Sequence, residues 1–151
     1  MTAASLPLTG GCQCGAIRYA LRAEPSNPHI CHCRMCQRAF GSYFAPLASV
    51  PRAALEWTAG APAIYRSSLA AERGFCAACG TPLTFAYVDK DRIAVSLGSL
   101  DDPARVTPAR AYGAESRVAF FDELSALPAT CAEEDVPAAD LPRYRPLNPQ
   151  P

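Results

Sequence analysis

The sequence has no excess of charge of either sign and no long hydrophobic run. Fourteen Lys and Arg residues balance fourteen Asp and Glu residues, and Lys90 is the single lysine. A balanced chain lacks the positive potential that attracts a phosphate backbone, so we expect no nucleic-acid partner. No stretch approaches the roughly 18 apolar residues of a membrane span, so we expect no membrane partner. Residues 1–11 lack the basic and apolar segments of a secretory signal, which predicts a cytoplasmic protein.

The chain also offers little room for long helices. Fifteen prolines and nine glycines are scattered along 151 residues, and they interrupt almost every window of several helical turns. Hydrophobic residues alternate with other residues, as in half-buried strands, over 17–21, 83–87 and 93–97. Further strands are expected over 42–49, 54–58 and 63–67, and short helices over 35–39 and 101–105. The predicted fold class is therefore mostly β, in one domain of half-hydrophobic composition.

Cysteine, in contrast, is abundant. The chain has eight cysteines, and seven of them fall into three clusters. The clusters are a C-x-C at 12–14, a C-x-C-x-x-C at 31–36 and a C-x-x-C at 76–79, and Cys131 stands alone. A disulfide framework requires an oxidising compartment, for which no export signal is visible. Disulfides at such short spacings are strained, whereas two thiolates at these spacings converge on one ion. The spacing therefore favours metal sites over disulfides.

The first and last clusters are each followed by a glycine that lets the backbone turn around a metal. Cys12, Cys14, Cys76 and Cys79 together offer four thiolates, a complete tetrahedral set for a structural zinc. The sequence leaves open whether the two pairs share one ion.

The middle cluster supplies three ligands, Cys31, Cys33 and Cys36. A closed structural zinc uses four protein ligands, whereas a catalytic zinc keeps one position for water or substrate. The spacing thus favours an open position, with His32, His29 or Cys131 as alternative fourth ligands. His32 lies between two ligands in an extended segment, so its side chain should point away from the metal, behind the ligands or at the surface.

Four segments in this order, GGCQCGAIRYA, CHCRMCQRAFGSYF, YRSSLAAERGFCAACGTPLTF and GSLDDP, resemble the glutathione-dependent formaldehyde-activating enzyme (GFA) family, the domain also found in centromere protein V. The resemblance runs from Gly10 to about Phe121, with an echo of the family's LPRY at 141–144. It implies a β-tent fold of mixed, mainly antiparallel sheets clasped by zinc. We assign residues 8–130 to this domain and 131–151 to a proline-rich C-terminal tail, which we expect to be extended from Val136 onward.

The resemblance also implies two zinc ions per chain and a carbon–sulfur lyase type of reaction. The structural zinc would be held by Cys12, Cys14, Cys76 and Cys79, and the catalytic zinc by Cys31, Cys33 and Cys36. In the family's reaction, glutathione or a related small thiol adds to formaldehyde to give S-hydroxymethylglutathione. One departure bears on the substrate: residues 109–120 lack a histidine that the family often carries there, and Phe120 replaces a common tryptophan.

Substrate-binding candidates follow from the same resemblance. Glutathione carries two carboxylates, so arginines beside the cysteine clusters would suit it, namely Arg34, Arg38 and Arg73. Each could instead be a solvated surface arginine. Pocket candidates that follow a cysteine or match a family motif are Gln37, Ser67 and Ser68.

The alternative function is a non-catalytic zinc module that binds a macromolecule, as the centromere member implies. The dispersed arginines and the acidic run at 133–135 argue against a nucleic-acid partner for such a module. A third interpretation is zinc storage or trafficking, and the motifs alone do not distinguish zinc from iron.

Overall fold

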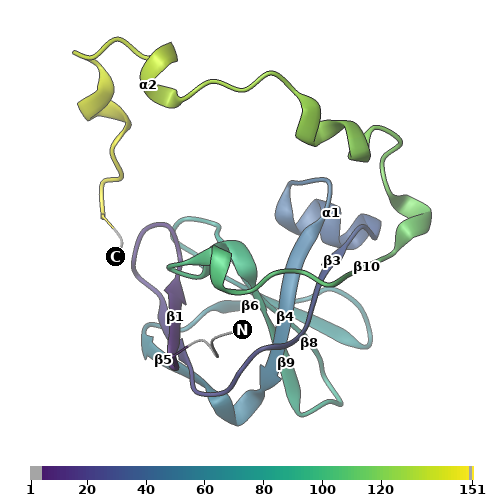
Figure 1. Ribbon diagram of the computed structural model, residues 1–151. Coiled ribbons are helices and arrows are strands. Elements are labelled where there is room, and N and C mark those ends of the chain that lie inside the picture. The colour runs from purple at the N-terminus through teal and green to yellow at the C-terminus, as the bar shows by residue number, and fades with distance from the viewer. Residues whose placement is uncertain (1–4, 150) are drawn as a thin grey trace.

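The computed structural model describes residues 5–149 and 151. This described part contains ten strands in two sheets and only short helices, which confirms the predicted mostly β fold class (Figure 1). The smaller sheet has the order β1-β2-β5, with β1 Leu8–Gly11, β2 Arg18–Leu21 and β5 Leu55–Ala59.

The larger sheet has the order β10-β3-β4-β9-β8-β7-β6. Its strands are β3 Ser26–Cys31, β4 Ala45–Pro51, β6 Ala63–Arg66, β7 Ala71–Phe75, β8 Pro82–Tyr87, β9 Arg92–Ser96 and β10 Arg110–Tyr112. Neighbouring strands pair antiparallel in both sheets, apart from β10 and β3, which run parallel. The sheets are therefore mixed and mainly antiparallel, as expected.

Strand β4 is buried on both faces and separates two hydrophobic cores. Successive side chains of a strand point to opposite faces. Ala48 and Val50 belong to the main core, which includes residues of β1 and β2, whereas Ala45 and Leu47 belong to a smaller core. The smaller core contains Cys36, so the middle cysteine cluster lies on the face of the larger sheet that is turned away from the main core.

The helix expected over 35–39 is α1, Arg34–Phe40. It begins after Cys33, whose sulfur accepts a hydrogen bond from the Cys36 amide, and ends at Gly41 with a left-handed φ of 57°. The helix expected over 101–105 is a shorter 3₁₀ turn, Pro103–Arg105, capped by the Asp102 carboxylate.

The acidic residues of GSLDDP have a structural role. Asp101 accepts hydrogen bonds from Arg18 of β2 and Thr9 of β1, with Arg18 Nη2 2.5 Å from its Oδ2 atom. The Arg18 hydrogen bonds hold the pKa of Asp101 below its ordinary value. This motif therefore fastens the smaller sheet to the end of β9 through the turn that follows it.

Strands β1, β3, β7 and β10 were not predicted. β1 ends in two glycines, and β3 contains Pro28 where its register with β4 shifts. Neither residue type favours a strand, so tertiary pairing overrides the local preference here.

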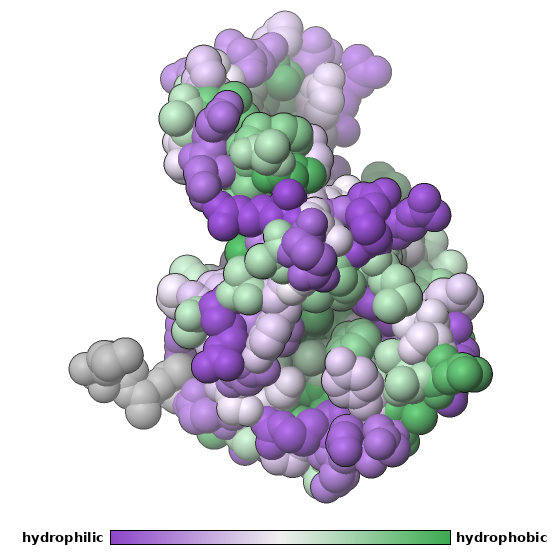
Figure 2. All heavy atoms as spheres, turned by 90° about the vertical axis from the view of Figure 1, so that its right-hand side faces the viewer, coloured by the Kyte–Doolittle hydropathy of each residue, from purple (hydrophilic) through white to green (hydrophobic). Residues whose placement is uncertain are grey.

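Beyond β10 the chain rises away from the two sheets (Figures 1 and 2). It forms the 3₁₀ helices Ala114–Ser116 and Phe121–Ala126, the short helix α2 Ala132–Asp135 and a 3₁₀ turn Leu141–Tyr144. The stretch expected to be extended from Val136 onward thus includes one 3₁₀ turn, at Leu141–Tyr144. Among the described residues, no helix has the length and apolar character to cross a membrane.

Candidate metal centres

Four cysteines from two loops meet at one point between the sheets. Cys12 and Cys14 lie between β1 and β2, and Cys76 and Cys79 lie between β7 and β8. Their sulfur atoms all lie within 4.8 Å of one another, and the sulfurs of Cys14 and Cys76 are 3.8 Å apart. Sulfurs at tetrahedral positions about 2.3 Å from zinc are about 3.8 Å apart. The two pairs thus form one ligand group that fits zinc and joins the two sheets.

Disulfides are absent from this arrangement. The sulfurs of Cys12 and Cys14 are 3.5 Å apart, far beyond a bond of about 2.05 Å. All eight cysteines are free thiols.

Local hydrogen bonds hold both loops in position and favour ionised sulfur. The Ile17 amide donates to Cys12 Sγ at 3.2 Å, and the Thr81 hydroxyl lies 3.2 Å from Cys79 Sγ. Gly80 has a φ of 80°, which permits the tight turn after Cys79. Each loop is therefore shaped to present two sulfurs to one ion.

The pKa values of these thiols are shifted in opposite directions because the four sulfurs are adjacent. Burial opposes ionisation of Cys79, but hydrogen bonds from Thr81 lower its pKa to about 6. The Ala16 amide favours ionisation of Cys14, yet the neighbouring cysteines raise its pKa to about 12. Ionising one thiol thus suppresses ionisation of the next, and a divalent ion would remove that conflict.

The second ligand group comes from one continuous segment. Cys31 ends β3, Cys33 precedes α1 and Cys36 lies in its first turn. The three sulfurs lie within 4.8 Å of one another, and among the described residues no His, Cys, Asp or Glu joins them as a fourth ligand. Burial raises the pKa of Cys31 to about 12, with a further contribution from Cys36. A divalent ion here would have three protein ligands and an open position.

The three alternative fourth ligands lie outside this group. The His29 ring packs edge-on against Tyr112, and its Nδ1 atom is 2.8 Å from the Asn27 carbonyl oxygen. Cys131 is exposed at the start of α2. His32 is fully buried beside Phe121 at 4.7 Å between ring centres, so the expectation of a possible surface position was wrong.

Arg73, one of the predicted substrate-binding residues, contacts a cysteine of the three-cysteine group. It extends from β7, is 7% exposed, and donates from Nη2 to Cys36 Sγ at 3.5 Å. Its guanidinium lies over the Phe85 ring, 5.0 Å from the ring centre. Burial raises the pKa of the Cys36 thiol, whereas the hydrogen bond from Arg73 opposes that rise.

The other predicted substrate residues have local roles. Gln37 is buried and donates to the carbonyl oxygens of Tyr43 and Ser116, while its own carbonyl accepts from Arg34. Arg34 and Arg38 are exposed on α1. Ser67 and Ser68 shape the turn between β6 and β7, where the Ser68 hydroxyl accepts from the amides of residues 70 and 71.

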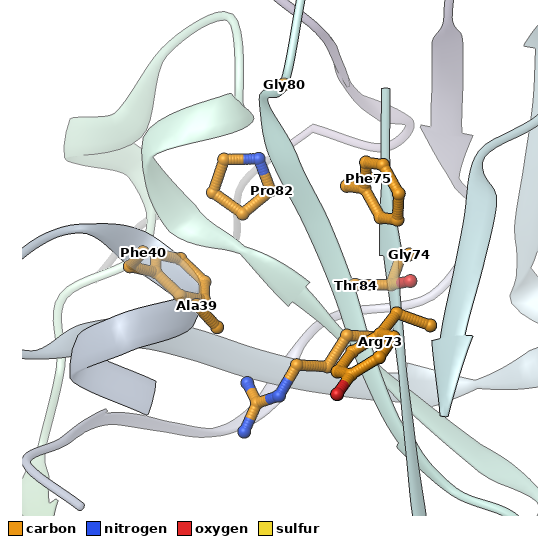
Figure 3. A pocket seen from close by; sticks show the side chains of 9 residues that line it. Ala39, Phe40, Arg73, Gly74, Phe75, Gly80, Pro82 and Thr84 are labelled. Carbon is orange, nitrogen blue, oxygen red and sulfur yellow. The ribbon is translucent and has the colours of Figure 1, made fainter. Parts of the chain in front are cut away.

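A pocket of about 240 Å³ opens between α1 and strands β7 and β8 (Figure 3). Its lining is mainly apolar and includes Phe40, Tyr65, Phe75, Pro82 and the stem of Arg73. Figure 3 shows the Arg73 side chain along one side of the pocket, with its guanidinium turned towards α1. One residue thus connects the pocket with the three-cysteine group.

The segment after β10 also contributes to the site, which the sequence did not predict. Gly113 has a φ of 64°, and a β-carbon there would lie 2.6 Å from the Cys33 amide nitrogen. Phe120, the position of the family's common tryptophan, packs against Tyr43 at 5.2 Å between ring centres. In the sequence, the glycine at position 113 is the one feature that indicates the close approach of this segment to Cys33.

Two metal ions per chain are expected in protein purified under reducing conditions. The reason is that the seven clustered sulfurs form one group of four and one of three. Elemental analysis against protein concentration checks this number. A reproducible ratio of one, with the Cys31 group free of metal in protein purified in added zinc, would contradict the two-site arrangement.

This architecture is that of a β protein whose two sheets are clasped by four cysteines and which carries a second, three-cysteine ligand group beside a pocket. The family model described as glutathione-dependent formaldehyde-activating enzyme (GFA) matches residues 7–115, and the chain belongs to this family.

Two individual proteins are similar to this chain. An uncharacterized lyase of Schizosaccharomyces pombe is 34% identical over 80 residues, which are 53% of this chain and 58% of that protein. The chain thus spans little more than half the length of this curated relative. A crystal structure of a Rhodobacter sphaeroides protein covers 69% of this chain and 99% of its own, with a TM-score of 0.56 and 21% identity. At that identity the likeness concerns the fold.

Proposed function

We propose that this protein is a zinc-dependent carbon–sulfur lyase-type enzyme that acts on the adduct of a small thiol and an aldehyde. The observation that carries the proposal is the three-cysteine group, which lacks a fourth ligand among the described residues and adjoins a pocket through Arg73. Membership of the GFA family and the lyase name of the yeast relative support it. Glutathione and formaldehyde are the substrates that the family name suggests.

The reaction we propose forms or breaks one carbon–sulfur bond. The thiol sulfur bonds to the formaldehyde carbon, and the thiol proton ends on the carbonyl oxygen, which gives S-hydroxymethylglutathione without any oxidant or reductant. A zinc ion on Cys31, Cys33 and Cys36 would supply a Lewis acid with one position open to the thiol or the carbonyl oxygen. The four-cysteine group would hold a second zinc with a structural role.

The chain's own residues would bind and orient the thiol. Phe40, Phe75 and Pro82 offer an apolar wall for its aliphatic part. Arg34 and Arg38 are exposed on α1, the helix that forms one side of the pocket, and would suit the carboxylates of glutathione. Gln37, Ser67 and Ser68 would act indirectly, by holding α1 and the β6–β7 turn that flank the pocket. A reducing compartment such as the cytoplasm would keep these thiols available.

Glutathione is expected to bind the cobalt-substituted protein and to add a sulfur-to-metal charge-transfer band to its absorption spectrum. Binding to the metal deprotonates the thiol, so the apparent affinity should weaken as pH falls. A titration at several pH values measures both effects. An unchanged spectrum at saturating glutathione, with cobalt shown to occupy the Cys31 group, would contradict the proposal and favour a non-catalytic metal-binding module.

Turnover is then measured as the rate of S-hydroxymethylglutathione formation or breakdown. The addition also proceeds without an enzyme, so the control is buffer with the same concentrations of thiol and aldehyde. A second control replaces glutathione by its S-methyl derivative, which has the same carboxylates but no thiol proton and cannot form the adduct.

A further inference from the structure

Arg73 is a buried cation that has no carboxylate partner in the part of the chain that the structure describes. Its Nε and Nη1 atoms are buried and have no hydrogen-bond partner among the described residues. The acidic residue beside it, Glu72, points to the other face of β7, where it forms an ion pair with Arg52. An arginine stays charged in any protein environment, and a buried charge without a counter-charge is strongly unfavourable. The compensating negative charge must therefore come from another group.

The three-cysteine group can provide that charge. Arg73 Nη2 lies 3.5 Å from Cys36 Sγ, and the Phe85 ring fixes the guanidinium from one side without neutralising it. Three thiolates around a divalent ion carry one net negative charge, which Arg73 balances. An anion at the open position would bring the net charge of the metal centre and its ligands to −2. Arg73 offsets one unit of this negative charge, which favours binding of the anion.

We propose that Arg73 is the counter-cation of the three-cysteine metal centre and makes its open position selective for anionic ligands over neutral ones. Arg73 is thus a positioning residue, because it acts on the bound ligand through the charge of the centre. The inference rests on the metal site of the proposed function but not on the identity of the thiol or the aldehyde. It limits the ligand class to groups that bind as anions, such as thiolates.

The test compares an anionic and a neutral probe on the cobalt-loaded full chain. Azide and imidazole are titrated into the wild type, Arg73→Gln and Arg73→Lys, and binding is followed by the visible cobalt spectrum. We expect Arg73→Gln to bind azide about tenfold more weakly or worse and imidazole within about threefold of the wild type. Arg73→Lys keeps the charge and should recover part of the azide affinity.

A matched control removes Arg22, which directly follows β2. Arg22→Gln loses the same charge but only an ion pair with Glu56 at the surface, so both affinities should stay at their wild-type values. A purely structural role of Arg73 would instead weaken azide and imidazole binding alike.

The outcomes separate this inference from the proposed function. Wild-type protein that takes no cobalt at the Cys31 group would overturn both. Cobalt binding with equal changes in azide and imidazole affinity, or with none, in Arg73→Gln would overturn only the role of Arg73. Should Arg73→Gln fail to fold, Arg73→Lys decides alone: its shorter side chain should weaken azide binding a few-fold and leave imidazole binding unchanged, and equal changes in both would overturn the inference.

Discussion

Replacing Cys76 by serine is expected to leave the chain unfolded or insoluble. Cys76 is 1% exposed and packs in the main core, where its sulfur is one of four that clasp the two sheets. Structural zinc contributes roughly 10–16 kcal/mol in small domains, as much as the whole stability of about 5–15 kcal/mol of a typical domain. Losing one of four ligands therefore removes an interaction on which folding depends. Soluble yield, far-UV circular dichroism and the melting temperature measure the effect.

The long sequence separation between Cys76 and Cys14 adds to the destabilisation expected from Cys76→Ser. Cys76 lies 62 residues after Cys14, and closing a flexible loop of that length costs roughly 3.7 kcal/mol. The matched control is Cys131→Ser, which alters an exposed free thiol and should leave the melting temperature unchanged. If Cys76→Ser folds with a wild-type melting temperature after losing its metal, the clasp does not stabilise the fold.

The sequence predicted β2, β8 and β9 from alternating apolar residues. The structure places several of these residues in the main core, namely Tyr19, Leu21, Leu83 and Val95. β7 shows no such pattern, because its buried residues include Arg73 and a glycine. The residue that lines the pocket and contacts Cys36 thus interrupts the alternating pattern of its own strand.

The cysteine spacing predicted the two cysteine groups well, because cysteines within one short motif lie close together in any fold. The sulfur positions agree with the division into four and three, and they add the pairing of the two loops, which the sequence had left open. The burial of His32 and the approach of Gly113 to Cys33 depend on the pairing of β10 with β3, whose partner residues are 81 positions apart in the sequence. Contacts at such separations follow from the topology and cannot be deduced from local pattern.

Cys33→Ser is expected to fold and to keep the metal ion of the four-cysteine group. It should lose the second metal ion, and with it thiol binding and activity. Serine is among the preferred residues at the start of a helix, so it can replace Cys33 Sγ as acceptor of the Cys36 amide hydrogen bond. The three ligands span only six residues, and an ion held by so short a segment binds the unfolded chain as well, which limits its effect on stability. We expect a loss of about 1 kcal/mol, or a melting temperature lower by about 2–4 °C.

The ion in the four-cysteine group serves as the internal control for this variant. The number of metal ions per chain, measured by elemental analysis, should fall from two to one. The cobalt-substituted variant should show no new absorption band with glutathione. Cys33→Ser and Cys76→Ser must therefore differ in kind, since one loses a ligand of a local site and the other a connection between the sheets. Equal loss of fold in both variants would show that the three-cysteine group is structural as well, which would remove the open position on which the proposed enzyme depends.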